Sequence, residues 1–320
     1  MEGSAGRAEQ LLHGGEGVWS GPPSVTERVN EASVEMDVVS PTGFLRVCRH
    51  SDAQLFSGWR SGLSVYDLLP SLDHLVTVVA SLLRAPAQEE AAVVLSGCGT
   101  SGRLAFFLSR GFNELLVGLG RKPLFYYLVS GGDEAVIASR ESAEDNPHLG
   151  TQDLIAITKG KARVLFVGIT CGFSAGYVAG QLVYAMSQPH FSSVLLGFNP
   201  VSLARDNPIE KWDHTFKQVA VRLQQAHLRD LADSAGAPPR HYVLNPLVGP
   251  ETLTGSSRMK GGSATKFLLE TIFARAIAEV GGVDLVPSPS ADAPLFPKPV
   301  TTEGLLQAYE ITYRQAPHSS

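Results

Sequence analysis

Residues 92–103 read AVVLSGCGTSGR, an apolar run followed by a glycine-rich turn, and the apolar stretch LAFFLSRGFNELL continues the chain. The run is apolar throughout instead of alternating, which is typical of a strand that helices cover on both faces. A strand, a turn and a helix in this order form the repeating unit of a parallel α/β sheet. We therefore expect this stretch to be the first strand and helix of such a sheet.

Four further apolar runs follow, with enough chain between them for a helix each time. They are LFYYLVSG at 124–131, RVLFVGI at 163–169, SVLLGFN at 193–199 and HYVLNPLVG at 241–249. Strands that alternate with helices pair in parallel. The sequence therefore predicts an α/β fold, a three-layer αβα sandwich around a five-stranded parallel sheet.

Composition and periodicity divide the chain into five parts. Residues 1–40 are rich in Gly, Ser, Glu and Pro, a composition that cannot offset the entropy of ordering, so we expect a flexible tail. Residues 41–90 form a helical lead-in, because leucine and valine recur there three and four residues apart. The α/β domain spans 91–282 and ends at two glycines that stop its last helix. Five prolines mark 283–301 as a linker, and a short helix with a truncated C-terminus is expected over 302–320.

Composition and charge exclude several classes of protein. The 26 Lys and Arg residues are scattered and the net charge is −5, which does not suit a nucleic-acid binder. There is no wholly apolar run of about 18 residues and no signal peptide, so we expect no membrane association and a location in the nucleus and cytoplasm. Three cysteines without a CxxC pair and nine histidines without HxxxH spacing predict no disulfide, metal or other cofactor.

The glycine spacing of the first turn permits two interpretations. Gly97, Gly99 and Gly102 satisfy GxGxxG, the fingerprint of a dinucleotide site in a dehydrogenase. Such a site needs an acidic residue about 20 residues further on, but the stretch 117–123 reads VGLGRKP and the next acid there is Asp133. We therefore favour a compact phosphate bound at the start of the helix, where N–H groups and the helix dipole attract anions.

Hydroxyl groups support this interpretation. Thr100 and Ser101 stand at the mouth of the first turn, and residues 170–174, TCGFS, repeat the arrangement after the third strand. A single glycine turn more often serves only to reverse the chain. Two hydroxyl loops at the carboxyl edge of one sheet can converge on one ligand, because ligands bind where the strand order reverses.

A third segment, residues 248–271, reads VGPETLTGSSRMKGGSATKFLLET. Ser256, Ser257, Arg258 and Lys260 bring two hydroxyls and two cations together among several glycines. The segment does not satisfy the GxxxxGK[ST] pattern of a Walker A loop. We expect it to complete an anion site.

These segments, together with SGGDEAVIASRESAEDN at 130–146 and GFNPVSLARDNPIE at 197–210, resemble the sugar isomerase (SIS) domain family. The resemblance covers residues 40–280 and is to the branch shared by N-acetylmuramic acid 6-phosphate etherases and vertebrate glucokinase regulatory proteins. It implies a parallel sheet that binds phosphorylated sugars at its strand ends. For the regulatory members it further implies binding of fructose 6-phosphate and fructose 1-phosphate, and inhibition of glucokinase.

The resemblance also implies which residues contact the ligand: Gly99, Thr100, Ser101, Glu144, Thr170, Gly172, Ser174, Ser256, Ser257 and Lys260. Glu144 matches the catalytic base of the etherases, and the position of their acid is Gly111 here. A glycine cannot transfer a proton, and loss of a general acid costs about 10²–10⁴-fold in rate. We expect a non-catalytic regulator; the alternatives are a lyase, etherase or isomerase with Glu144 as base, or Glu144 as a mere surface acid.

Three features depart from the family pattern. Cys98 stands where the regulatory proteins usually have glycine, and residues 281–301 do not resemble the helical segment expected there. The regulatory proteins also continue into a second SIS domain and a helical lid. We expect this chain to supply one wall of the pocket and to lack the glucokinase contacts of the other half.

Overall fold

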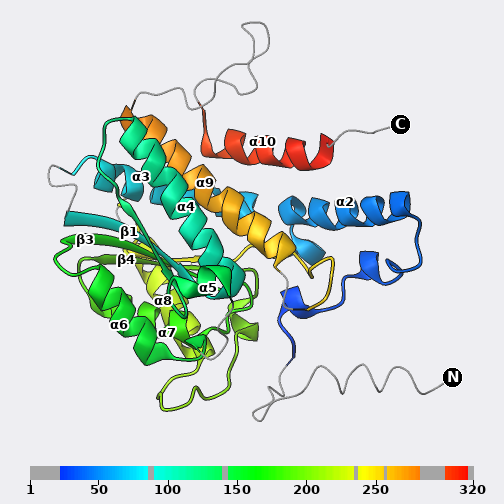
Figure 1. The fold of residues 1–320 in the computed structure, drawn as a ribbon, viewed down its shortest axis with the longest axis horizontal. Coiled ribbons are helices and arrows are strands. Elements are labelled where there is room, and N and C mark those ends of the chain that lie inside the picture. The colour runs from blue at the N-terminus through cyan, green and yellow to red at the C-terminus, as the bar shows by residue number, and fades with distance from the viewer. Residues whose placement is uncertain are drawn as a thin grey trace, which may run out of the picture.

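The computed structural model of the chain describes residues 22–85, 90–138, 143–233, 237–255, 258–281 and 300–315. Its centre is a sheet of five parallel strands in the order β2-β1-β3-β4-β5 (Figure 1). The strands are β1 (Ala91–Gly97), β2 (Phe125–Val129), β3 (Arg163–Ile169), β4 (Phe191–Leu196) and β5 (His241–Leu244). The predicted five-stranded parallel sheet is confirmed.

The register aligns the carboxyl ends of all five strands. Gly97 pairs with Val129 on one side and with Ile169 on the other, Ile169 pairs with Leu196, and Leu196 pairs with Leu244. The strand order reverses between β1 and β3, because β1 is followed by β2 on one side and β3 lies on the other. The loops after β1 and β3 therefore start side by side at this switch point.

Helices cover both faces of the sheet (Figure 1). One layer holds α3 (Leu69–Leu83), α4 (Gly99–Gly118) and α9 (Met259–Gly281), and the other holds α6 (Pro147–Ile157), α7 (Gly176–Ser187) and α8 (Phe216–Asp233). Successive residues of β1 supply both cores: Val93 and Leu95 join the first, and Ala92 and Val94 join the second. This explains why the strands are apolar without alternation.

The segment Tyr66–Leu83 is long and apolar enough to cross a membrane by length and composition alone. Its apolar residues instead pack into the first core, since Leu72, Leu75 and Val79 are at most 1% exposed and Leu82 is 2% exposed. They recur three and four residues apart, the spacing from which the sequence predicted a helix here, and that helix is confirmed. We conclude that α3 is a core helix of the α/β domain.

Two outer helices pack beside this layer. α2 (Pro41–Ser57) begins at Ser40, whose Oγ accepts a hydrogen bond from the N–H of Gly43. α10 (Thr302–Gln315) confirms the short helix expected near the C-terminus and contacts α2, α3 and α9. The ring of Phe56 in α2 lies between Phe267 of α9 and Tyr313 of α10. Aromatic packing thus joins both outer helices to the domain.

The prediction of a flexible tail over 1–40 is wrong for residues 22–33, which pack against the domain. Two single-turn helices, Val25–Glu27 and Glu31–Ser33, lie in this segment. Asn30 between them is 1% exposed, and its Nδ2 donates to Ser51 Oγ, Gln54 Oε1 and the Pro250 carbonyl. Hydrogen bonds from short polar residues order the segment, and a search for apolar periodicity does not detect them. Residues 1–21 and most of the linker predicted at 283–301 lie outside the described residues.

Candidate functional site

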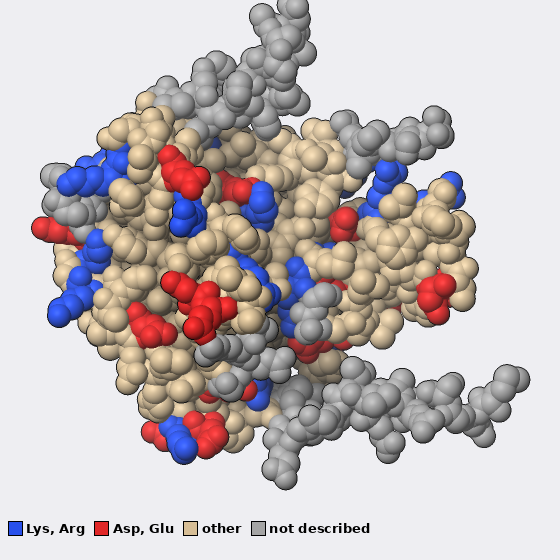
Figure 2. All heavy atoms as spheres, in the orientation of Figure 1, with Lys and Arg blue, Asp and Glu red and all other residues tan. Residues whose placement is uncertain are grey.

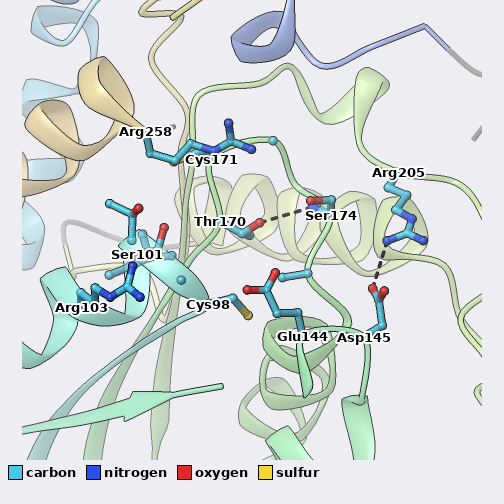
Figure 3. A pocket seen from close by; sticks show the side chains of 15 residues that line it. Cys98, Ser101, Arg103, Glu144, Asp145, Thr170, Cys171, Ser174, Arg205 and Arg258 are labelled. Atoms are coloured by element: carbon cyan, nitrogen blue, oxygen red, sulfur yellow. Dashed lines mark hydrogen bonds and ion pairs between the residues drawn. The ribbon is translucent and has the colours of Figure 1, made fainter. Parts of the chain in front are cut away.

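A cavity of about 410 Å³ opens at the carboxyl ends of β1 and β3 (Figure 3). Seven predicted site residues line it: Gly99, Thr100, Ser101, Glu144, Thr170, Gly172 and Ser174. Ser101 lies on one side of the space in Figure 3, and Thr170 and Glu144 lie on the other. The structure therefore brings together residues that are up to 75 positions apart in sequence.

The first wall of the cavity is the start of α4. Gly102 is required there, because a Cβ at this position would lie 2.7 Å from the Gly97 carbonyl oxygen and 2.8 Å from Val129 Cγ1. Gly99 has φ +50°, a conformation that side chains other than glycine rarely adopt. Glycine at position 102 therefore allows the first turn of α4 to pack closely against the end of the sheet. The N-terminus of α4, where the first N–H groups of a helix lack intrahelical acceptors, lies at the cavity with Thr100 and Ser101.

The second wall is the loop between β3 and α7. Thr170 Oγ1 accepts a hydrogen bond from the N–H of Ser174 at 3.3 Å. Phe173 has φ 59°, which is strained for a residue with a side chain. Its ring is fully buried and stacks on Phe216, and its carbonyl accepts from the N–H of Arg205. Burial of this ring holds the loop in a strained form that presents two hydroxyls to the cavity.

The third wall contains Arg258, just before α9. Its guanidinium donates to the Gly255 carbonyl and forms an ion pair with Glu27 at 3.1 Å. Ser256 and Ser257, two of the predicted ligands, lie outside the described residues. Glu251 is fully buried and accepts from the N–H groups of Lys260 and Gly261. An internal carboxylate therefore caps α9, so the start of this helix is not open to a bound anion.

Lys260 does not line the cavity, which corrects its prediction as a ligand. Its side chain is fully buried, and Nζ donates to Gln54 Oε1 at 2.6 Å and to the Pro250 carbonyl at 3.0 Å. Burial lowers the pKa of Lys260 to about 8, although the nearby Glu251 and Asp52 favour its charged form. Lys260 is a structural residue that joins α2 to the loop before α9.

The sequence interpretation missed two further arginines and an acid as cavity residues. Arg205 and Asp145 form an ion pair at 3.0 Å on the cavity wall, drawn in Figure 3. Arg103 also lines the cavity, and its Nε donates to the Val136 carbonyl at 2.9 Å. Arg103 and Arg205 belong to the quoted motifs, so cations next to glycine and hydroxyl loops were the available signal. The cavity thus combines hydroxyls, three guanidinium groups and two carboxylates.

The two cysteines in the lining are poor nucleophiles. Burial raises the pKa of Cys171 to about 11. Burial and, to a smaller extent, the charge of Glu144 raise the pKa of Cys98 far above its usual range. Both thiols are therefore protonated at neutral pH, and the thiolate is the reactive form of cysteine.

Gly111 lies on an exposed part of α4 and is not in the cavity lining. Eight residues of helix separate it from Arg103, a rise of about 12 Å. The proposed loss of proton transfer at this position remains a prediction that needs an activity assay. Among the described residues no group of three His, Cys, Asp or Glu side chains is placed to hold a metal ion.

Several known proteins have sequences similar to this one. A family model described as the glucokinase regulatory protein N-terminal SIS domain matches residues 74–186. The chain is 42% identical over 306 residues to the glucokinase regulatory protein of Xenopus laevis and 45% identical over 259 residues to that of Homo sapiens. These alignments cover 91% and 79% of this chain but 45% and 40% of the relatives. The chain therefore spans less than half the length of these regulatory proteins.

A more distant relative is an enzyme. The N-acetylmuramic acid 6-phosphate etherase of Aliivibrio fischeri (strain MJ11) is 31% identical over 260 residues, which cover 81% of this chain and 71% of the etherase. The match to both kinds of protein runs through the sheet and the cavity loops described above. The chain belongs to the SIS-domain family that includes glucokinase regulatory proteins and N-acetylmuramic acid 6-phosphate etherases.

Proposed function

We propose that the chain is a regulatory protein that binds sugar phosphates and does no chemistry on them. The observation that carries this proposal is the cavity between the start of α4 and the loop after β3. It offers the hydroxyls of Thr100, Ser101, Thr170 and Ser174 next to the N-terminus of α4, an arrangement suited to a phosphate. Its volume of about 410 Å³ falls in the range of small-molecule sites.

The ligands we propose are fructose 6-phosphate and fructose 1-phosphate. Glu144 and Asp145 can accept hydrogen bonds from sugar hydroxyls, and Arg258 can donate to a phosphate. Each charge-assisted hydrogen bond contributes about 1.5–3 kcal/mol, so a few of them give micromolar to millimolar affinity. Affinity in this range suits a protein that responds to a metabolite.

The partner we propose is glucokinase, which the regulatory relatives are named for regulating. A chain that inhibits glucokinase must meet it, so we propose the nucleus and cytoplasm as its location. Inhibition of purified glucokinase by this chain, with and without fructose 6-phosphate, tests the partnership directly. If the glucokinase rate is unchanged at a high concentration of the chain, this part of the proposal is refuted.

A thermal-shift titration with each fructose phosphate tests ligand binding. A ligand present at 100 times its Kd stabilises the native state by about 2.7 kcal/mol, so we expect a saturable rise in Tm. Ser101→Ala removes one cavity hydroxyl and should weaken binding about 10-fold or more. Ser187→Ala is the matched control, because Ser187 is exposed at the far end of α7. A folded chain whose Tm does not respond to millimolar ligand would refute the proposed site.

The second candidate function is an enzyme that uses Glu144 as base. It is favoured by the position of Glu144 in the cavity and by the etherase relative. Release of lactate from N-acetylmuramic acid 6-phosphate, lost in Glu144→Gln, would establish this activity. We expect no release, because the position that matches the etherase acid is Gly111.

A further inference from the structure

One cation of the cavity is paired with an acid from the N-terminal segment. Arg258 Nη2 lies 3.1 Å from Glu27 Oε1, and Arg258 Nη1 donates to the Gly255 carbonyl at 3.1 Å. Both terminal nitrogens of this guanidinium therefore have partners within the chain. The side chains of Arg258 and Glu27 are 19% and 45% exposed, so water shields the ion pair only in part.

The backbone of Glu27 is fixed beside the cavity. Glu27 ends the single-turn helix Val25–Glu27, where the N–H of Val25 donates to Asn199 Oδ1 at 3.0 Å. Asn199 Nδ2 in turn donates to the carbonyl of Gly172, a residue of the cavity lining, at 3.1 Å. Thr26, between Val25 and Glu27, is fully buried. The backbone of this turn is therefore anchored, and only the half-exposed side chain of Glu27 can turn away into water.

The carboxylate of Glu27 lies close to the loop that we expect to hold the phosphate. A Cβ added to Gly172 would lie 3.8 Å from Glu27 Oε1. In Figure 3, the side chain of Arg258 extends toward the same loop, which carries Thr170 and Ser174. A phosphate group bound between this loop and Arg258 carries a charge of about −1.5 to −2 at pH 7 and repels a carboxylate nearby. Glu27 and the phosphate therefore compete for one guanidinium.

The charge of the surrounding surface does not decide this competition. On the face of the molecule in Figure 2, basic and acidic residues are interspersed, so no broad field of one sign attracts an anion there. An anionic ligand must then gain its electrostatic stabilisation from individual cations in the cavity. The partner that Arg258 already has consequently affects how tightly a phosphate binds.

We propose that Glu27 is an internal competitor of the ligand and sets the affinity of the site. In the ligand-free chain its carboxylate holds Arg258, and on binding the phosphate group replaces it while the carboxylate turns into water. This inference rests on the proposed sugar-phosphate site and adds a residue that reduces the affinity of that site. The N-terminal turn thus takes part in ligand binding without contacting the ligand.

Calorimetric titration of wild type and Glu27→Gln with fructose 1-phosphate, fructose 6-phosphate and inorganic phosphate tests the competition. Glu27→Gln removes the charge but keeps the size of the side chain, so we expect Kd to fall about 3- to 10-fold. The ligand-free variant should at the same time unfold at a slightly lower urea concentration, because it loses an ion pair. A merely structural role of Glu27 would weaken both binding and stability.

The matched control is Glu31→Gln. Glu31 belongs to the same segment and forms an ion pair with Arg60, and its side chain is 76% exposed. The substitution changes the net charge of the chain by the same amount as Glu27→Gln. It should leave Kd unchanged, since Glu31 does not line the cavity or pair with Arg258.

A double-mutant cycle shows whether Glu27 acts through Arg258. Arg258→Gln should weaken phosphate binding about 10-fold, because a charge-assisted hydrogen bond is lost. In this background Glu27→Gln should change Kd less than 2-fold, since there is no guanidinium left to compete for. Tighter binding that appears in Glu27→Gln alone and vanishes with Arg258→Gln would establish the competition.

The possible failures distinguish this inference from the proposed site. If wild type binds a fructose phosphate and Glu27→Gln binds it equally or more weakly, the competition is refuted while the site stands. The same conclusion follows if Glu31→Gln tightens binding as much, or if the effect of Glu27→Gln persists without Arg258. If no variant and no wild-type chain binds any of the three phosphates, the proposed site and the competition are both refuted.

Discussion

Lys260 places a positive charge in the interior of the domain. Its Nζ donates to Gln54 of α2 and to the Pro250 carbonyl, and its backbone N–H donates to the Glu251 carboxylate. The ammonium group thereby joins α2 to the loop before α9. Because burial opposes the charged form, the pKa of Lys260 falls from 10.5 to about 8.

This shift predicts how stability depends on pH. Between pH 8 and 10.5 the unfolded chain binds a proton at Lys260 that the folded chain has lost, so this residue makes stability rise with pH in that window. We expect the free energy of unfolding of wild type, relative to Lys260→Met, to increase by about 2 kcal/mol from pH 7 to pH 10. Urea unfolding of both proteins measures this difference, in which the titration of the buried tyrosines and cysteines cancels. Parallel pH profiles would contradict the assignment.

The sequence predicted the hydroxyl loops of the site but not the orientation of its cations. Glycine and hydroxyl residues after apolar runs singled out Thr100, Ser101, Thr170 and Ser174, and all four line the cavity. Arg258 and Lys260 are cations of the same segment, yet only one of them lines the cavity: Arg258, just before α9, does, whereas Lys260, in the first turn of α9, is fully buried. Which one does so depends on how α9 packs, and local sequence does not contain that information.

At the scale of the elements, α6 and α7 approach each other through two glycines. A Cβ at Gly150 would clash with the Tyr177 carbonyl oxygen, and a Cβ at Gly180 would clash with the Pro147 carbonyl oxygen. The two helices therefore make backbone contact above the second core. This contact fixes α7, whose first turn follows the cavity loop that carries Ser174.

We predict that Gly180→Ala destabilises the protein by about 1–3 kcal/mol, because the added methyl group must push two helices apart. Gly111→Ala is the control: it also adds one methyl group inside a helix, but into open space, and should stabilise the chain by about 0.4–1 kcal/mol. Urea unfolding compares the two. Equal stability of both variants would show that the α6–α7 contact adapts.

The strands were largely predictable from the sequence, because burial on both faces leaves each strand apolar. The residues at which the strands end were harder to predict. The run 241–249 predicted a strand of that length, but β5 ends at Leu244, and Val248 beyond it is fully buried without pairing. Apolar residues indicate burial, whereas the end of a strand depends on where its neighbour ends.

At the scale of the whole molecule, the N-terminal segment connects the cavity loops to α2. The N–H of Val25 donates to Asn199 Oδ1, and the Thr26 carbonyl accepts from the N–H of Glu251. Glu27 pairs with Arg258 on the cavity wall. Residues 22–33 therefore form part of the domain although they contain no long helix or strand.

Asn30 is the residue on which this connection depends most. Its amide makes three hydrogen bonds to α2 and the loop before α9, and its Oδ1 accepts from the N–H of Ala32. Asn30→Ala should cost about 2–3 kcal/mol, because several buried partners lose their hydrogen bonds at once. Ser33→Ala, which removes one partly buried hydrogen bond nearby, should cost less than about 1 kcal/mol. Urea unfolding measures both changes in stability. Limited proteolysis within the segment that follows residue 22 should become faster in Asn30→Ala but not in Ser33→Ala. If neither stability nor cleavage responds to this change, the segment is not held by Asn30, and the ordering of residues 22–33 must come from the contacts of Val25 and Thr26.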